Sequence, residues 1–225
     1  GHVTVTGAGS AWHTVGLWVA DQGMGSLTVE DGGEVTNSGN SAYVAREVGA
    51  TGNVIVTGAG SDWTNELSVY LGYRGTGDLA ISDGGHVNSN SSAVLASGPD
   101  SHATAAVTGT DSTWTVVGIL LVGDHGTAQA TVADGGLIDA SQIQVGDDGS
   151  FHIDNGGTVS VDTLVNNGQI LINTSGQILA SDITTHGHVQ NNGTITAAVT
   201  VDAGGLVTGT GTFIGPVVVG NGGTF

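Results

Sequence analysis

A tandem repeat of 51 residues constrains this 225-residue chain more than any other feature. Three related hexapeptides, GAGSAW, GAGSDW and GTDSTW, end on tryptophans that lie 51 residues apart, at Trp12, Trp63 and Trp114. The tripeptide DGG recurs in nearly the same register, beginning at Asp31, Asp83 and Asp134. Repeats of this size bury their apolar residues by stacking on neighbouring copies, so the chain is expected to form a stacked array.

Each repeat divides into two coils of about 25 residues. The pattern apolar-x-apolar-Gly/Ala occurs as LWVA, AYVA, VYLG, AVLA, LLVG and IQVG. The third residues of these motifs follow one another at similar steps, at Val19, Val44, Leu71, Leu95, Val122 and Val145. Because side chains alternate along a strand, these residues and those two positions earlier are expected to point inward.

Further inward positions follow the glycine-rich turns of every coil. A second strand carries apolar pairs such as Leu27 and Val29, and the DGG and GAGS corners lead to a third inward column. That column contains Val35, Trp63, Val87, Trp114 and Ile138. Short strands separated by glycine corners predict an all-β fold, a parallel β-solenoid of about nine coils of roughly 25 residues. A propeller is the alternative, disfavoured because successive segments repeat one in–out pattern in the same order.

The organisation of the chain changes near residue 150. Residues 1–150 hold the regular 51-residue repeats, with two coils in each. Residues 151–225 carry looser signatures, including one NNG motif that begins at Asn166 and another that begins at Asn191. We interpret this second part as a continuation of the same solenoid with degenerate coils, without a firm domain boundary.

Composition excludes several classes of function. Only Arg46 and Arg74 oppose 20 acidic residues, which gives a net charge of -18 and would repel phosphate backbones and anionic headgroups. We therefore expect no nucleic-acid partner. The chain has no cysteine, so it has neither a disulfide nor a thiolate metal site, and no apolar run approaches the ~20 residues of a membrane helix. The sequence is expected to be a fragment of a longer exported protein.

The strings VTVTGAGSAW and GLWVADQGMGSLTVEDGGEV resemble the repeat of type V secreted autotransporter passengers and of some PEP-CTERM-associated exported proteins. The resemblance covers roughly residues 3–148, and the NNGTI-type coils that follow resemble ordinary passenger sequence. It implies a right-handed β-helix, export across the outer membrane and exposure on the bacterial cell surface. It also implies a separate C-terminal β-barrel, outside this sequence, as the only membrane contact. It does not specify a ligand.

One outward row of side chains is the best candidate for a binding surface. The residue between the two inward positions of the first strand should face solvent, and five successive copies are apolar or aromatic: Trp18, Tyr43, Tyr70, Val94 and Leu121. Stacked at ~4.8 Å, they would form an apolar stripe of the kind that marks interaction surfaces. Equally, the side chains could ladder against one another for stability, or an outer loop could cover them.

Other conspicuous residues favour structural roles. The repeated tryptophans share a column with valines and are expected to fill corners rather than stack on sugars. The DGG aspartates are expected to accept bonds from local backbone N–H groups, because copies two coils apart lie too far from one another to share a calcium ion. His186 and His188 share a strand face, but two ligands are not a metal site. We expect no metal and no cofactor.

No catalytic signature is present, and a repeating surface offers no single cleft, so we expect that the chain is not an enzyme. The preferred interpretation is an adhesive or self-associating stalk of a surface passenger, whose partners are host or bacterial surface molecules or its own copies. A passive spacer that projects another domain is the first alternative. A polysaccharide-acting enzyme on a β-helix is the second.

Overall fold

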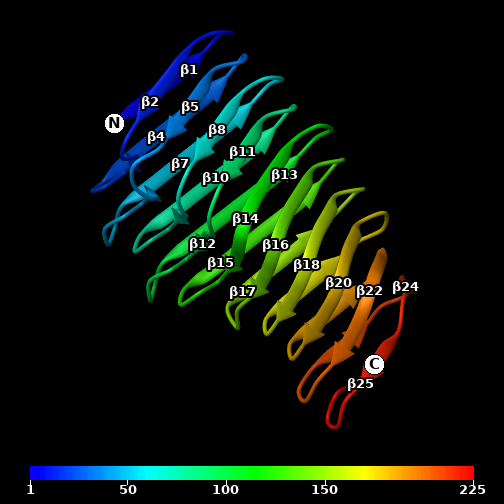
Figure 1. The fold of residues 1–225 in the computed structure, drawn as a ribbon. Coiled ribbons are helices and arrows are strands. Elements are labelled where there is room, and N and C mark those ends of the chain that lie inside the picture. The colour runs from blue at the N-terminus through cyan, green and yellow to red at the C-terminus, as the bar shows by residue number, and fades with distance from the viewer.

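The computed structural model describes residues 1–225 as an all-β rod of parallel strands without any helix (Figure 1). The chain winds repeatedly around one axis, so that every strand pairs with strands of the preceding and following coils. No helix is present that could cross a membrane. The fold is therefore the parallel β-solenoid that the repeat predicts.

The first sheet stacks ten strands along the rod. In sheet order they are β1 (His2–Thr6), β4 (Met24–Glu30), β7 (Thr51–Thr57), β10 (Thr76–Ser82), β13 (His102–Thr108), β15 (Thr127–Ala133), β17 (Gly149–Ile153), β19 (Gln169–Ile172), β21 (His188–Asn191) and β23 (Leu206–Thr208).

The second sheet has 15 strands. Its main path is β2 (Ala11–Thr14), β5 (Glu34–Asn37), β8 (Asp62–Asn65), β11 (His86–Ser89), β14 (Thr113–Val122), β16 (Leu137–Val145), β18 (Thr158–Asn166), β20 (Gln177–Thr185), β22 (Thr194–Val201) and β24 (Thr212–Ile214). The strands off this path are β3 (Trp18–Val19), β6 (Ala42–Val44), β9 (Val69–Leu71), β12 (Ala93–Leu95) and β25 (Val217–Val219).

The expected count of about nine coils of roughly 25 residues is wrong. Coil length is also not constant along the chain. Between β4 and β7, Leu27 pairs with Val54, whereas between β17 and β19, Phe151 pairs with Ile170, so the later coil is clearly shorter. Much of the shortening lies in the turn that returns from the second sheet to the first: β12 ends at Leu95 and β13 begins at His102, whereas β16 ends at Val145 and β17 begins at Gly149. In addition, β14 covers in a single strand what β11 and β12 cover in two, without a change in length. Residue 150 lies inside β17, and both sheets run past it.

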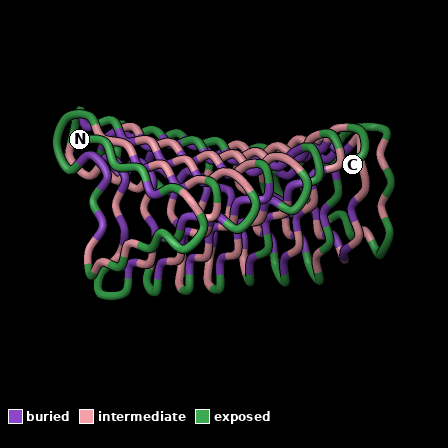
Figure 2. Tube along the Cα trace, turned by 90° about the horizontal axis from the view of Figure 1, so that it is seen from above, coloured by how far each residue is buried: buried purple, intermediate pink, exposed green.

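One continuous apolar core runs along the inside of the rod, and the exposed residues lie mainly at its turns (Figure 2). Strand after strand shows alternating burial, and in β7 the buried residues include Val54 and Val56, as predicted. The predicted third column is buried as well, with Val35, Trp63, Val87, Trp114 and Ile138 each at most 1% exposed. Inward alternation in the sequence therefore identifies the core correctly.

Candidate functional site

The predicted outward stripe forms one continuous row on the third face of the solenoid. Trp18 pairs with Tyr43, Tyr43 with Tyr70, Tyr70 with Val94, and Val94 with Leu121. These residues lie in β3, β6, β9, β12 and the C-terminal part of β14. Because the backbone register places them directly above one another, the five side chains follow the solenoid axis.

Exposure decreases from the first member of the stripe to the others. Trp18 is 51% exposed, whereas Tyr43, Tyr70, Val94 and Leu121 are half-buried. The stripe is thus neither fully open to solvent nor covered by an outer loop. Half-buried side chains in register also contact their neighbours, so part of their surface stabilises the coils themselves.

Stacking between the tyrosines accounts for much of that partial burial. The rings of Tyr43 and Tyr70 are parallel, with centroids 5.0 Å apart and an interplanar angle of 7°. Tyr73, in the turn after β9, packs edge-on against both rings at 5.1 and 5.4 Å. Each such pair stabilises by about 0.5–1.5 kcal/mol beyond burial of its area. The laddering that the sequence left as an alternative therefore operates at these positions.

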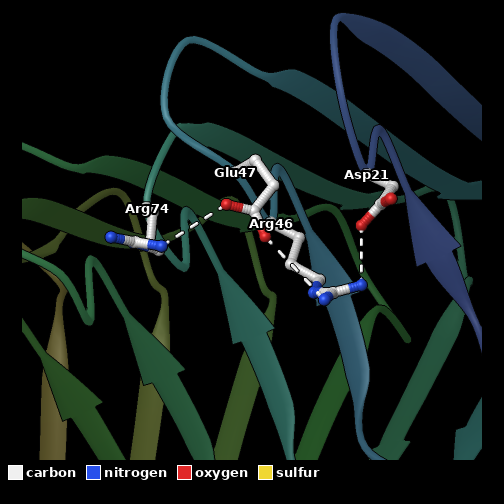
Figure 3. A network of polar contacts seen from close by, with 4 residues as sticks. All are labelled: Asp21, Arg46, Glu47 and Arg74. Carbon is white, nitrogen blue, oxygen red and sulfur yellow. Dashed lines mark hydrogen bonds and ion pairs between the residues drawn. The ribbon is translucent and has the colours of Figure 1, made fainter.

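Both arginines of the chain lie beside this stripe in an ion-pair network with two carboxylates (Figure 3). Arg46 lies 2.8 Å from Asp21 and 3.8 Å from Glu47, and Arg74 lies 3.4 Å from Glu47. Because the side chains are 34–55% exposed, each pair stabilises by less than about 1 kcal/mol. The network therefore contributes little to the free energy of unfolding, and its main effect is on the local charge of the surface.

Charge balance distinguishes this surface from the rest of the molecule. The network combines two positive and two negative groups and is neutral as a unit. The remaining 18 acidic residues, 20 minus 2, have no lysine or arginine anywhere else in the chain. A neutral or anionic partner therefore meets less negative charge at the aromatic stripe than at the acidic remainder of the surface.

The hydroxyl of Tyr43 stays protonated in this environment. Burial raises the pKa of Tyr43 above its ordinary value of 10.0, and neighbouring Tyr70 and Tyr73 raise it further. The positive charge of Arg46 acts in the opposite direction but does not outweigh them. The Tyr43 side chain consequently presents a neutral ring and hydroxyl throughout the physiological pH range.

Sequence reasoning missed three contributors to this surface: Tyr73, the arginine network and Leu67. Leu67 is 44% exposed at a corner between the two halves of the second sheet, where Val15 and Val117 are 70% and 56% exposed. These corner residues recur close to the 51-residue period, so the repeat carried a signal for them. Tyr73, Arg46 and Arg74 lie in turns that recur from coil to coil, but these residue types do not recur there, so no periodicity points to them.

The repeated tryptophans have the structural role that the sequence predicts. Trp63 and Trp114 are fully buried, and Trp12, in the first coil, is half-buried against the core. Indole Nε1 of Trp114 donates a hydrogen bond of 3.3 Å to Ser89 Oγ in the preceding coil. These rings consequently fill corners of the core, and Trp63 and Trp114 offer no face to a ligand.

The DGG corners differ in detail from the expectation. Asp31, Asp83 and Asp134 adopt positive φ of 53°, 53° and 55°, which asparagine and aspartate tolerate better than most residues. The carboxylates of Asp31 and Asp83 do not accept the expected hydrogen bonds from local backbone N–H groups. Instead, they accept hydrogen bonds from the hydroxyls of Thr6 and Thr57, one coil earlier, at 3.4 and 3.2 Å. Backbone conformation is therefore the main reason for aspartate at this corner.

The histidines do not converge. His186 lies 3.5 Å from Asp202, whereas His188 bonds to Thr208 at 2.9 Å. No group of three or more histidine, aspartate or glutamate side chains is arranged to hold a metal ion. The aromatic stripe with its arginine network remains the best-defined candidate site.

Architecture and surface together define the chain as a segment of a parallel β-solenoid protein. Over 97 residues it is 36% identical to the Adhesin BmaC autotransporter of Brucella suis biovar 1 (strain 1330), a match that covers 41% of this chain and 3% of that protein. Over 119 residues it is 30% identical to the uncharacterized protein YuaQ of Escherichia coli (strain K12), covering 51% of this chain and 8% of that protein. The chain thus spans a small part of the length of these relatives.

No family model matches the chain. No solved structure matches it either. Similarity to an autotransporter adhesin and a parallel β-solenoid fold are both compatible with a surface passenger.

Proposed function

We propose that this chain is part of the passenger of an autotransporter-type bacterial surface protein and that its aromatic stripe is an adhesive contact face. The single observation that carries the proposal is the row of Trp18, Tyr43 and Tyr70 in register beside the neutral arginine network. Its partners would be host or bacterial surface molecules, or other copies of the same chain. The coils would wind right-handed, as nearly all parallel crossovers do.

The proposal fits the energetics of a repeated surface. Partly exposed aromatic side chains desolvate readily on contact, and they carry little charge that must be stripped of water. A single row of five side chains is short for a stable interface on its own. Several such rods on one cell would bind many partners at once, so weak contacts would combine through multivalency.

A passive spacer is the second candidate, and the regular coil-on-coil pairing of both sheets favours it. A spacer needs stiffness along its axis but no particular outward chemistry. The two functions therefore predict different effects of substitutions on one outward face. A contact face would lose adhesion, whereas a spacer would not.

The decisive experiment replaces Trp18, Tyr43 and Tyr70 together with serine in the full protein displayed on cells. The matched control replaces Thr28, Ile55 and Ala80 with serine, because these residues form an outward, half-buried row in register on the first sheet. Reduced cell aggregation and surface binding for the stripe variant alone would support the contact face. Unchanged adhesion in both variants, with native circular dichroism, would show that the stripe is not the contact face. These coils would then act as a spacer for an adhesive surface elsewhere in the protein.

We also propose that the chain is not an enzyme. Its outward surface repeats from coil to coil, and its two cationic side chains are engaged by carboxylates. Incubation with bacterial and plant polysaccharides is expected to release no reducing ends or unsaturated products. Turnover of any one of them would contradict this proposal.

A further inference from the structure

The aromatic ladder is interrupted at its first step. Tyr43 and Tyr70 stack face to face, and Tyr73 covers their edges, so these rings are occupied by one another. Trp18 is in register with Tyr43, yet its ring makes no stacked contact with it. A β-carbon built on Gly16 would lie 3.4 Å from Cη2 of Trp18, so the indole lies back over that glycine. Trp18 consequently keeps a half-exposed ring on which no other aromatic ring stacks, although the Arg46 guanidinium lies 5.9 Å from its centre.

A pocket of about 410 Å³ opens where the ladder is interrupted. It is lined by Trp18, Asn40, Ser41, Tyr43, Arg46 and Leu67. The hollow is open to solvent, so a ligand would rest on the Trp18 ring and on the polar groups beside it. The lining combines aromatic and aliphatic surface with hydroxyl, amide and guanidinium groups, which is the amphipathic mixture that a small polar ligand requires.

Several polar groups at this pocket retain unused hydrogen-bonding capacity. The Asn40 amide donates to Val15 O at 3.0 Å, which leaves its Oδ1 free to accept. Ser41 Oγ has no partner within the protein, and Arg46 directs one nitrogen to Asp21 and another towards Glu47. A guanidinium carries five N–H donors, so some remain for a ligand. Donors and acceptors are therefore both available beside an aromatic ring.

We infer that this pocket binds a short neutral saccharide, an inference that rests on the contact face proposed above. A pyranose ring has an apolar C–H face that matches an indole, and hydroxyl edges that match Asn40, Ser41 and Arg46. An anionic sugar is disfavoured because Arg46 already neutralises Asp21 and because the whole chain carries a net charge of -18. Arg46 lies 5.9 Å from the centre of the Trp18 ring and so borders the same space.

The test uses the whole chain with N,N′-diacetylchitobiose and lactose as neutral probes and 3′-sialyllactose as the acidic probe. Binding is followed by ligand-observed saturation-transfer NMR and by tryptophan fluorescence. We expect at least one neutral probe to bind, and Trp18→Ala to weaken that binding about tenfold, the loss of one aromatic contact. Ser41→Ala should also weaken it, whereas Val117→Ala, at an exposed corner of another coil, should not.

The outcomes separate this inference from the contact face itself. No binding of either neutral probe, or binding of the acidic probe alone, would overturn the saccharide assignment. So would neutral binding that survives both Trp18→Ala and Ser41→Ala. If the triple serine variant of the stripe still loses adhesion in these cases, the contact face stands with a different ligand.

Discussion

Two adjacent glycines in one DGG corner allow backbone conformation and coil-to-coil packing to be tested separately. Gly84 has a φ of +82°, and a β-carbon there would meet Ala59 Cα at an ordinary 3.5 Å. Gly85 needs no positive φ, but a β-carbon there would lie 2.5 Å from Val56 O and 2.8 Å from Val56 C in the preceding coil. The first glycine is thus required by φ and the second by close approach.

Asparagine at each position distinguishes the two requirements. At Gly84 the left-handed conformation is tolerated by asparagine, and the unfolded chain loses some freedom, so Gly84→Asn should change the free energy of unfolding by less than about 1 kcal/mol. At Gly85 the new β-carbon must push a coil backbone away, since ordinary contacts begin at 3.4 Å. Overpacking of this kind costs about 3 kcal/mol, at the upper end of its usual range.

Urea unfolding of both variants, followed by far-UV circular dichroism and by tryptophan fluorescence, provides the measurement. Trp63 and Trp114 are fully buried and lie in coils next to this corner, so their emission reports local opening. Gly84→Ala is a useful third variant, because alanine tolerates positive φ less well than asparagine. Equal costs for Gly84→Asn and Gly85→Asn would refute the reasoning, as would a larger cost at Gly84.

Three further predictions follow from single contacts. Ser89→Ala removes the acceptor of Trp114 Nε1 and should destabilise by about 1–3 kcal/mol in urea unfolding, with a shift in tryptophan emission. The raised pKa of Tyr43 means that only the unfolded state loses this proton near pH 10, so stability should fall as pH rises from about 10 through the raised pKa. Tyr43→Phe should remove that part of the pH dependence. Arg46→Gln should cost less than about 1 kcal/mol in thermal unfolding, because its ion pairs are 34–50% exposed.

Inward columns could be predicted from the sequence because a strand repeats every two residues and the core tolerates few polar side chains. Leu71 and Val122 were placed correctly by counting alone, and both are completely buried. The outward register from Trp18 to Leu121 follows from the same count. In residues 1–150, the alternation of apolar residues therefore predicts which side chains point into the core and which point outward.

Corner geometry could not be predicted in the same way. Within β14, register with β16 shifts between Val116 and Ile119, and this irregularity joins two strand directions that earlier coils separate with a turn. Nothing in the alternation of apolar residues distinguishes a turn from such a bend. A coil length averaged over the regular repeats therefore does not describe the shorter coils of the second part, such as the one between β17 and β19.

In the candidate site too, residues of the repeating strands could be predicted, whereas residues of the turns could not. Trp18 and Tyr43 belong to the repeating strands and could be placed. Tyr73 and Arg46 lie in a turn that recurs from coil to coil, but their residue types do not recur there. Two rings of the stripe use their faces for each other, which depends on side-chain angles rather than on register. The sequence therefore predicts the row of residues, but not that Tyr43 and Tyr70 stack on each other while Trp18 has no aromatic partner.

The 51-residue period, twice the coil, has a physical basis in the core. Tryptophan occupies the third inward column only in alternate coils, where Trp63 and Trp114 lie between the smaller Val35, Val87 and Ile138.

Each buried indole also needs a hydrogen-bond acceptor for its N–H group. Trp114 uses Ser89 of the coil before it, and Asn37 occupies the corresponding position for Trp63. Trp63 Nε1 and Asn37 Oδ1 are both buried without a hydrogen-bond partner, so the Trp63 coil lacks the bond that Trp114 makes. Large and small residues therefore alternate from coil to coil in the third column, and two coils, rather than one, form the unit that repeats.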